Sequence, residues 1–170
     1  VQPAHIDAIG QVLELHLALA SISFTDVSQT RAALERAAMS SSAAVRRAEP
    51  LTRAGDLHDR MREPMVPEDF NALDTSFHVA LAQAGDNQLL SDLAGAIRRS
   101  VHSTILLAEH RLTDWPAFQQ TLVAEHGAML DAVLAGDPDA AAMAVEEHVN
   151  GSYRVLLGSP TPSEDVDGEP

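Results

Sequence analysis

The sequence of 170 residues contains no cysteine and no lysine, and aromatic residues make up only 4% of it. Without cysteine the chain can form no disulfide and has no thiolate for catalysis or metal binding. Without lysine it lacks the amine of Schiff-base enzymes and the phosphate-binding lysine of a P-loop. These absences exclude several common classes of enzyme and nucleotide-binding protein.

Basic charge is also scarce, because 11 arginines are set against 25 acidic residues and the formal net charge is −14. Such an acidic chain repels nucleic-acid phosphates, so we expect this segment not to contact DNA itself. No apolar run approaches the roughly 18 residues of a membrane span, and we expect no membrane partner. The hydrophobic content of 45% is sufficient for a buried core. A reducing cytoplasm suits a chain without cysteine, and we expect the protein there.

Apolar residues recur at spacings of three and four along most of the chain, which is the pattern of amphipathic helices. No alternating strand pattern persists. The predicted helices cover residues 3–20, 27–44, 50–62, 67–84, 87–110, 115–135 and 138–157. Because the links between them are short, the sequence predicts an all-α fold, an antiparallel bundle of six or seven helices.

Residues typical of helix ends support these boundaries. Gly85 is placed to end the fourth predicted helix, and either Asp86 or Asn87 can cap the next one. The segment TDWPAF, residues 113–118, supplies a cap and a first-turn proline for the sixth. At residues 136–138, Gly-Asp-Pro ends one helix with glycine, caps the next with aspartate and begins it with proline. The last two predicted helices therefore form a hairpin with a tight turn.

Two polar residues interrupt the apolar face of the fourth predicted helix, in the stretch NALDTSFHVALAQAGDN at residues 71–87. Asp74 and His78 are four residues apart and are therefore neighbours on one helix face. His126 and His148 likewise lie on the apolar stripes of the last two predicted helices. Because the hairpin turn lies about midway between them, the two imidazoles are expected to face inward at one level.

One aspartate and three histidines on apolar faces indicate a metal site. A buried polar group without a partner costs on the order of several kcal/mol, and a divalent cation would satisfy all four groups at once. Imidazole nitrogen and carboxylate oxygen are ligands for zinc, nickel, manganese or iron(II). Two alternatives stay open: each histidine is a hydrogen-bonded core residue, or Asp74 and His78 form a simple pair within their helix.

Longer stretches around these residues resemble a known family. LDTSFHVALAQAGDNQLL, residues 73–90, resembles the D-x-x-F-H…A-x-x-N-x-x-L signature of the FCD domain. EHGAMLDAVLAGDPDAAAMAVEEHV, residues 125–149, resembles that family's second signature, H…A-I…G-D…A…H. TRAALERAAMSSSA, residues 30–43, is similar to its early R-x-x-L-E…A segment. The resemblance covers about residues 10–157, and the FCD domain is the ligand-binding C-terminal domain in the FadR branch of GntR-type transcription regulators.

The resemblance implies an all-helical antiparallel bundle that binds a metal through one aspartate and three histidines. These ligands match Asp74, His78, His126 and His148 here. Zinc is the metal we expect first, with nickel or manganese as alternatives. The resemblance also implies a small carboxylate effector beside the metal, and a homodimeric repressor whose N-terminal winged-helix domain binds DNA.

A domain organisation follows from the resemblance and the composition. Residues 1–157 are expected to be the effector- and metal-binding domain. Residues 158–170 contain almost no apolar side chain and are expected to be a disordered acidic tail. Nothing before residue 10 could form a winged helix, so we expect this chain to be the sensor half without its DNA-binding half.

Arg31 matches the arginine that holds the effector carboxylate in resembling members, and a planar guanidinium suits bidentate carboxylate binding. The alternative is a surface salt bridge with Glu35, four residues on. Arg98 and Arg99 are rival anion partners. The segment LELHLALASISFTDVSQTRAALE, residues 13–35, is most similar to the lactate-responsive regulators. L-Lactate is therefore the first effector to test.

The sequence thus predicts a metal-containing, effector-binding domain of a transcription regulator that is not an enzyme. One alternative is a metal-dependent enzyme that acts on a small hydroxy acid at the Asp/His3 site. No general base or nucleophile joins the four residues, because Glu125 adjoins His126 and consecutive helical residues point in different directions. The other alternative is a structural helical module with a core of satisfied histidines.

Overall fold

The computed structural model describes residues 10–13, 15–16, 19–20 and 22–158. Its helices are α2 (Phe24–Val45), α3 (Ala48–Met61), α4 (Pro67–Gln83), α5 (Gln88–Ser100), α6 (His102–Glu109), α7 (Trp115–Ala135) and α8 (Pro138–Leu157). A shorter helical stretch precedes α2, and the described part of the chain contains no strand. The predicted all-α fold is therefore confirmed. The predicted helix at 3–20 lies partly outside the described residues, and the predicted tail lies outside them except for residue 158.

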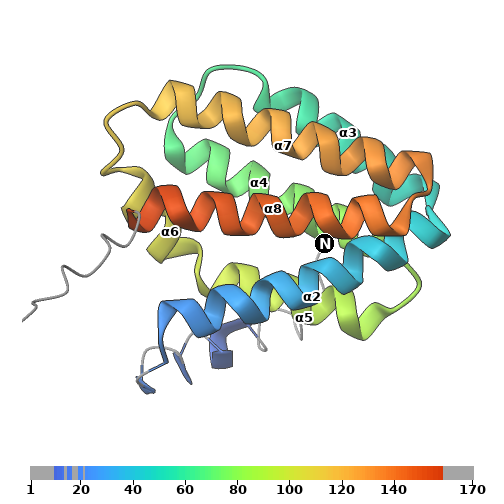
Figure 1. Ribbon diagram of the computed structural model, residues 1–170, viewed down its shortest axis with the longest axis horizontal. Helices are drawn as coiled ribbons and strands as arrows, with labels where there is room; N and C mark the ends of the chain where they lie inside the picture. Colours follow the sequence, from blue (N-terminus) through green and yellow to red (C-terminus); the bar gives the residue numbers. More distant parts are fainter. Residues whose placement is uncertain (1–9, 14, 17–18, 21, 159–170) are drawn as a thin grey trace, which may run out of the picture.

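The helices pack as a bundle in which α8 crosses the middle of the view between α7 and α2 (Figure 1). Helix α4 is central, because it contacts α2, α3, α5 and α7. Helix α6 lies at one end of the bundle, against α4, α5 and α8. Side chains of α4, α7 and α8 therefore meet in the interior, with α6 closing one side of that region.

The helix ends follow the predicted turn chemistry. The side chains of Asn87, Asp114 and Asp137 accept hydrogen bonds from backbone N–H groups in the first turns of α5, α7 and α8. Gly136 ends α7 with a φ of 71°, a left-handed conformation that glycine adopts without strain. The bounds of α7 and α8 match the predicted ones to the residue. Of the two candidate caps for α5, Asn87 rather than Asp86 is the one used.

The predicted single helix at 87–110 is wrong, because the chain bends at Val101 and forms two helices, α5 and α6. The Ser100 hydroxyl donates to the Ile97 carbonyl oxygen, 2.7 Å away, and so competes with the hydrogen-bond ladder of the helix. The β-branched Val101 is also a weak helix former. Apolar spacing continues through the bend, which is why the periodicity did not reveal it.

Gly85 does not end α4 in the predicted way. The helix ends at Gln83, and Gly85 is not among the glycines with positive φ. A Cβ at this position would lie 2.5 Å from the Oγ atom of Ser41 on α2. Glycine is therefore required here by the close approach of the α4–α5 link to α2.

The core involves α2, α3, α4, α7 and α8, and its part next to the polar residues lies where α4, α7 and α8 meet. Phe70, Phe77, Met129 and Val145 are completely buried there. The rings of Phe70 and Phe77 pack against the imidazole of His126, with centroid distances of 6.1 and 4.9 Å. An apolar layer therefore underlies the polar residues of the interior. Within the described residues, no helix combines the length and the apolar character of a transmembrane span.

Candidate metal centre and effector cavity

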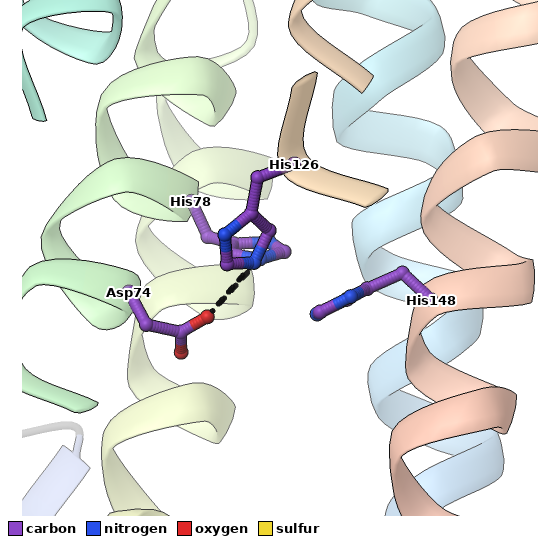
Figure 2. Close-up of side chains that lie close together, drawn as sticks. All are labelled: Asp74, His78, His126 and His148. Carbon is purple, nitrogen blue, oxygen red and sulfur yellow. Dashed lines mark hydrogen bonds and ion pairs between the residues drawn. The ribbon is translucent and has the colours of Figure 1, made fainter. Parts of the chain in front are cut away.

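The structure brings together the four residues that the sequence singled out. Asp74 and His78 project from α4, His126 from α7 and His148 from α8, and all four point toward one centre (Figure 2). One candidate ligand atom of each residue lies within 4.8 Å of those of the other three. The shared level of His126 and His148 follows from the α7–α8 hairpin, as the sequence indicated. Metal binding itself stays a prediction.

The three imidazoles are almost completely removed from water, with exposed fractions of 3% for His78, 0% for His126 and 2% for His148. Burial lowers the pKa of His78 well below its usual value, and the positive charge of Arg98 acts in the same direction. Burial likewise lowers the pKa of His148, reinforced by His126. His78 and His148 are therefore neutral at pH 7, which is the protonation state that binds a metal.

Two glutamates stand behind two of these imidazoles. Glu35 on α2 places Oε2 2.7 Å from Nδ1 of His78, and Glu125 on α7 places Oε2 2.8 Å from Nδ1 of His148. Because an ionised carboxylate accepts but cannot donate a hydrogen bond, both placements favour the tautomer with the proton on Nδ1 and the lone pair on Nε2. Glu125, which adjoins His126 in the chain, therefore contacts the centre through His148.

At the middle of the centre, the converging nitrogen and oxygen atoms outnumber the hydrogens that could form hydrogen bonds between them. His126 Nε2 lies 3.0 Å from Oδ1 of Asp74 and 3.3 Å from Nε2 of His78. Its other nitrogen, Nδ1, is buried with no hydrogen-bond partner among the described residues. A divalent cation would satisfy the converging acceptor atoms together, and three imidazole nitrogens with one carboxylate oxygen suit zinc. The residues present therefore fit a metal ion.

Two buried arginines are linked to this centre through Glu35. Arg31 Nε donates to Glu35 Oε1 at 2.6 Å, and Arg98 Nη1 donates to the same oxygen at 3.1 Å. Arg98 also donates through Nη2 to Asp74 Oδ2. The pair of Arg31 and Glu35 that we had considered therefore exists, but in the interior and not on the surface. It joins the candidate effector arginine to His78 through a shared carboxylate.

The arginines keep two of the buried carboxylates ionised. Burial by itself would raise the pKa of Glu35, but Arg31 and Arg98 hold it well below its usual range. Burial opposes ionisation of Asp74 as well, and there Arg98 and the hydrogen bond from His126 outweigh it. The interior of this acidic protein thus has its own compensating positive charge.

A cavity of about 20 Å³ adjoins the centre. Its lining combines charged, polar and apolar side chains: Arg31, Asp74, Arg98, Ile105, Glu109, Phe118, Leu122, His148, Ser152, Tyr153 and Leu156. Its volume corresponds to about one water molecule. Arg31 and its rival Arg98 both line this cavity, together with the two centre residues from α4 and α8.

Sequence analysis did not predict the part that three acidic residues take in this region. Glu35 could have been found. The helical stripe that begins at Val27 enters the core, and the charged residues Arg31 and Glu35 interrupt its apolar character. Glu125 was considered only as the chain neighbour of His126, and its contact with His148 was not predicted. Glu109 gave no signal, because it lies at the end of a helix that was not predicted separately.

Comparison with known proteins identifies the family of this chain. The family model of the FCD domain matches residues 26–151. Among solved structures, E. coli McbR/YncC superposes with a TM-score of 0.68 at 12% sequence identity, covering 82% of this chain and 66% of that chain. At this identity the likeness shows a shared fold. Comparison with curated protein sequences gives no significant match. The chain therefore belongs to the FCD domain family, the effector-binding domains of GntR-type transcription regulators, and is a regulatory domain, not an enzyme.

Proposed function

We propose that this domain senses a small carboxylate at a divalent metal ion held by Asp74, His78, His126 and His148. The observation that carries the proposal is the convergence of these four buried side chains beside a cavity lined by arginine. Glu35 and Glu125 hold two of the imidazoles with Nε2 available. A bound ion would act as a Lewis acid that attracts a carboxylate or hydroxy acid. We propose zinc, with nickel or manganese as alternatives.

Arg31 and Arg98 are the groups we assign to the effector carboxylate. The Arg31 guanidinium lies 5.6 Å from the centroid of the Tyr153 ring, a cation–π contact that supports its orientation. Glu35 keeps the pKa of Arg31 above its usual value although burial opposes this, so its charge is permanent. L-Lactate is the first effector to test, since both its carboxylate and its hydroxyl group can bind near a metal.

Effector binding has to enlarge the cavity, because lactate is several times larger than the single water molecule that about 20 Å³ can hold. Helix α6 forms one wall of this cavity through Ile105 and Glu109. We propose that displacement of this wall is the conformational change that the effector favours. An effector that prefers one conformation shifts the population toward it, by the difference in its affinity for the two.

In the complete protein we propose that this domain forms a homodimeric, cytoplasmic repressor with an N-terminal winged-helix domain. The dimer would present two DNA-reading domains to one operator, and the effector would change their spacing. Residues 1–157 would be the sensing domain and residues 158–170 an acidic tail. Family membership supports this arrangement, since FCD domains occur in such regulators.

The test is metal analysis followed by titration calorimetry on protein purified without chelators. We expect about one divalent ion per chain, by the four-ligand site. We also expect binding of L-lactate, or of another member of a panel with pyruvate, glycolate, citrate and gluconate, and loss of that binding after chelation. Less than about a tenth of an ion per chain would refute the metal site. A metal-loaded protein that binds none of the five acids would refute the effector class.

A further inference from the structure

Helix α6 has one buried residue, and that residue is acidic. Of its eight residues only Glu109 is buried, with an exposed fraction of 4%, and its side chain lines the cavity together with Ile105 one turn earlier. A carboxyl group is a costly side chain to bury, so an apolar residue would attach this helix more effectively. The presence of Glu109 is therefore not explained by packing.

The surroundings of Glu109 differ from those of the other buried carboxylates. Its Oε2 atom accepts a hydrogen bond of 3.1 Å from Nδ2 of Asn71, which is itself 2% exposed. Burial and the negative charge of Asp74 raise the pKa of Glu109 to about 7, and Arg98 only partly opposes this. A nearby divalent ion would favour its ionised form again. Glu109 therefore brings a negative charge into the cavity when the metal is bound.

Counting charges around the cavity shows what this residue does. Arg31 and Arg98 are balanced by Glu35 and Asp74, to which they donate hydrogen bonds. With neutral imidazoles, a divalent ion would then leave two positive charges among the groups at the cavity, since Glu125 lies behind His148, is partly exposed and does not line the cavity. An ionised Glu109 cancels one of them, so one effector carboxylate completes the balance. A second carboxylate on the effector would be in excess and close to Glu109.

We propose that Glu109 restricts the effector to monocarboxylates by repelling a second carboxylate in the cavity. This inference rests on the proposed function, since it presumes a carboxylate beside the metal. The apolar residues of the lining, among them Phe118, Leu122 and Leu156, suit the alkyl part of such a molecule. Two arginines in one cavity would otherwise be expected to attract dicarboxylates.

The experiment compares two ligands that differ in one carboxylate. L-Lactate and tartronate are both 2-hydroxy acids, and tartronate carries a carboxylate in place of the methyl group. Calorimetry on the metal-loaded wild type should give tighter binding of lactate by about tenfold, the order expected for one unfavourable charge pair in a partly buried site. Glu109→Gln should remove most of this preference by improving tartronate binding, while Glu109→Asp, which keeps the charge, should retain it.

Glu68→Gln is the matched control, because it also removes one negative charge near Glu109 but from the half-exposed pair of Glu68 with His110. It should leave the lactate-to-tartronate ratio unchanged. Metal content and circular dichroism establish that each variant is folded and loaded. An equal ratio in wild type and Glu109→Gln, or a wild type that prefers tartronate, would overturn the role of Glu109 and leave the proposed function intact. Absence of binding of either acid to the wild type would count against the proposed function instead.

Discussion

The two sides of the interior site are built from different kinds of structure. The metal side uses α4, α7 and α8, which have 17, 21 and 20 residues and bury several apolar side chains each. The effector side is closed by α6, which has eight residues and buries only Glu109. Long, well-packed helices open rarely, whereas a short helix with little buried surface opens at low free-energy cost.

The two sides would answer two conflicting requirements, a preformed geometry for the metal ligands and a movable wall for the effector cavity. Metal ligands need a geometry that is already correct before the ion arrives, and the packing around the histidines would provide it for the proposed metal. A ligand cavity of about 20 Å³ needs a wall that can move. Under the proposed function the chain would meet both, with the candidate ligands on the long helices and the adjustable wall on α6. The buried network of Glu35 and the two arginines connects the two sides.

The largest expected effect comes from removing one of the proposed metal ligands. Replacing His126 or His148 by Ala should reduce metal content to near zero, because each residue is one of only four proposed ligands. The metal-dependent part of the stability should vanish too, which is about 2.7 kcal/mol when free metal exceeds its Kd a hundredfold. Elemental analysis and thermal melts measure both quantities. His110→Ala is the control, since His110 pairs with Glu68 outside the centre and should leave both unchanged.

Next in size is the effect of replacing Arg31, the proposed partner of the effector carboxylate. Arg31→Ala should weaken lactate binding by roughly 1.5–3 kcal/mol, the usual worth of a hydrogen bond to a charged group. Metal content should be largely kept, because Glu35 retains Arg98 and His78 as partners. Calorimetry measures the affinity, with Arg36→Ala on the same helix as the control. Unchanged affinity in the Arg31 variant would transfer the role to Arg98.

A smaller effect is expected from replacing Glu125, which contacts the proposed ligand His148. Glu125→Gln should lower metal affinity by about tenfold, at the lower end of the range for residues that orient a ligating histidine. The effect arises because an amide holds the Nδ1–H of His148 less firmly than a carboxylate does. Competition with a chelator of known affinity measures it. Equal metal affinity in this variant would mean that packing alone orients His148.

The smallest effect concerns the pH dependence of the metal-free protein. The pKa of Glu109 is raised to about 7, so folding favours its protonated form. Its contribution to stability is therefore complete below the unfolded value of about 4.5 and is lost as the pH rises through 7. His78 and His148, whose pKa values are lowered, act oppositely and lose their contribution as the pH falls below 6.5.

Comparing wild type with Glu109→Gln isolates the glutamate, because the histidines are common to both proteins. The stability of the wild type relative to the variant should decrease between pH 5 and pH 8. Denaturant titrations at several pH values in the presence of a chelator provide the measurement. Parallel stability curves across that interval would show that Glu109 does not titrate there.

Much of the metal side was predictable because its information is local and periodic. Asp74 and His78 interrupt an apolar stripe at a spacing of four, and the Gly-Asp-Pro turn sets His126 and His148 at one level. Helix periodicity converts such spacings directly into positions on a face. The bend at Val101 was not predictable in this way, because apolar spacing is the same before and after it. The cavity wall on α6 therefore remained hidden.

By itself the sequence determined the all-α class, most of the helices and their ends, the family and the four candidate ligands. These depend on residues within one helix or one hairpin, where backbone geometry relates spacing to direction. Only the tertiary structure decided that Glu35 contacts His78 and both arginines, that Glu125 contacts His148, and that Glu109 lines the cavity. Most of these contacts join different helices of the bundle. The spacing of side chains within one helix does not indicate which other helix they will contact.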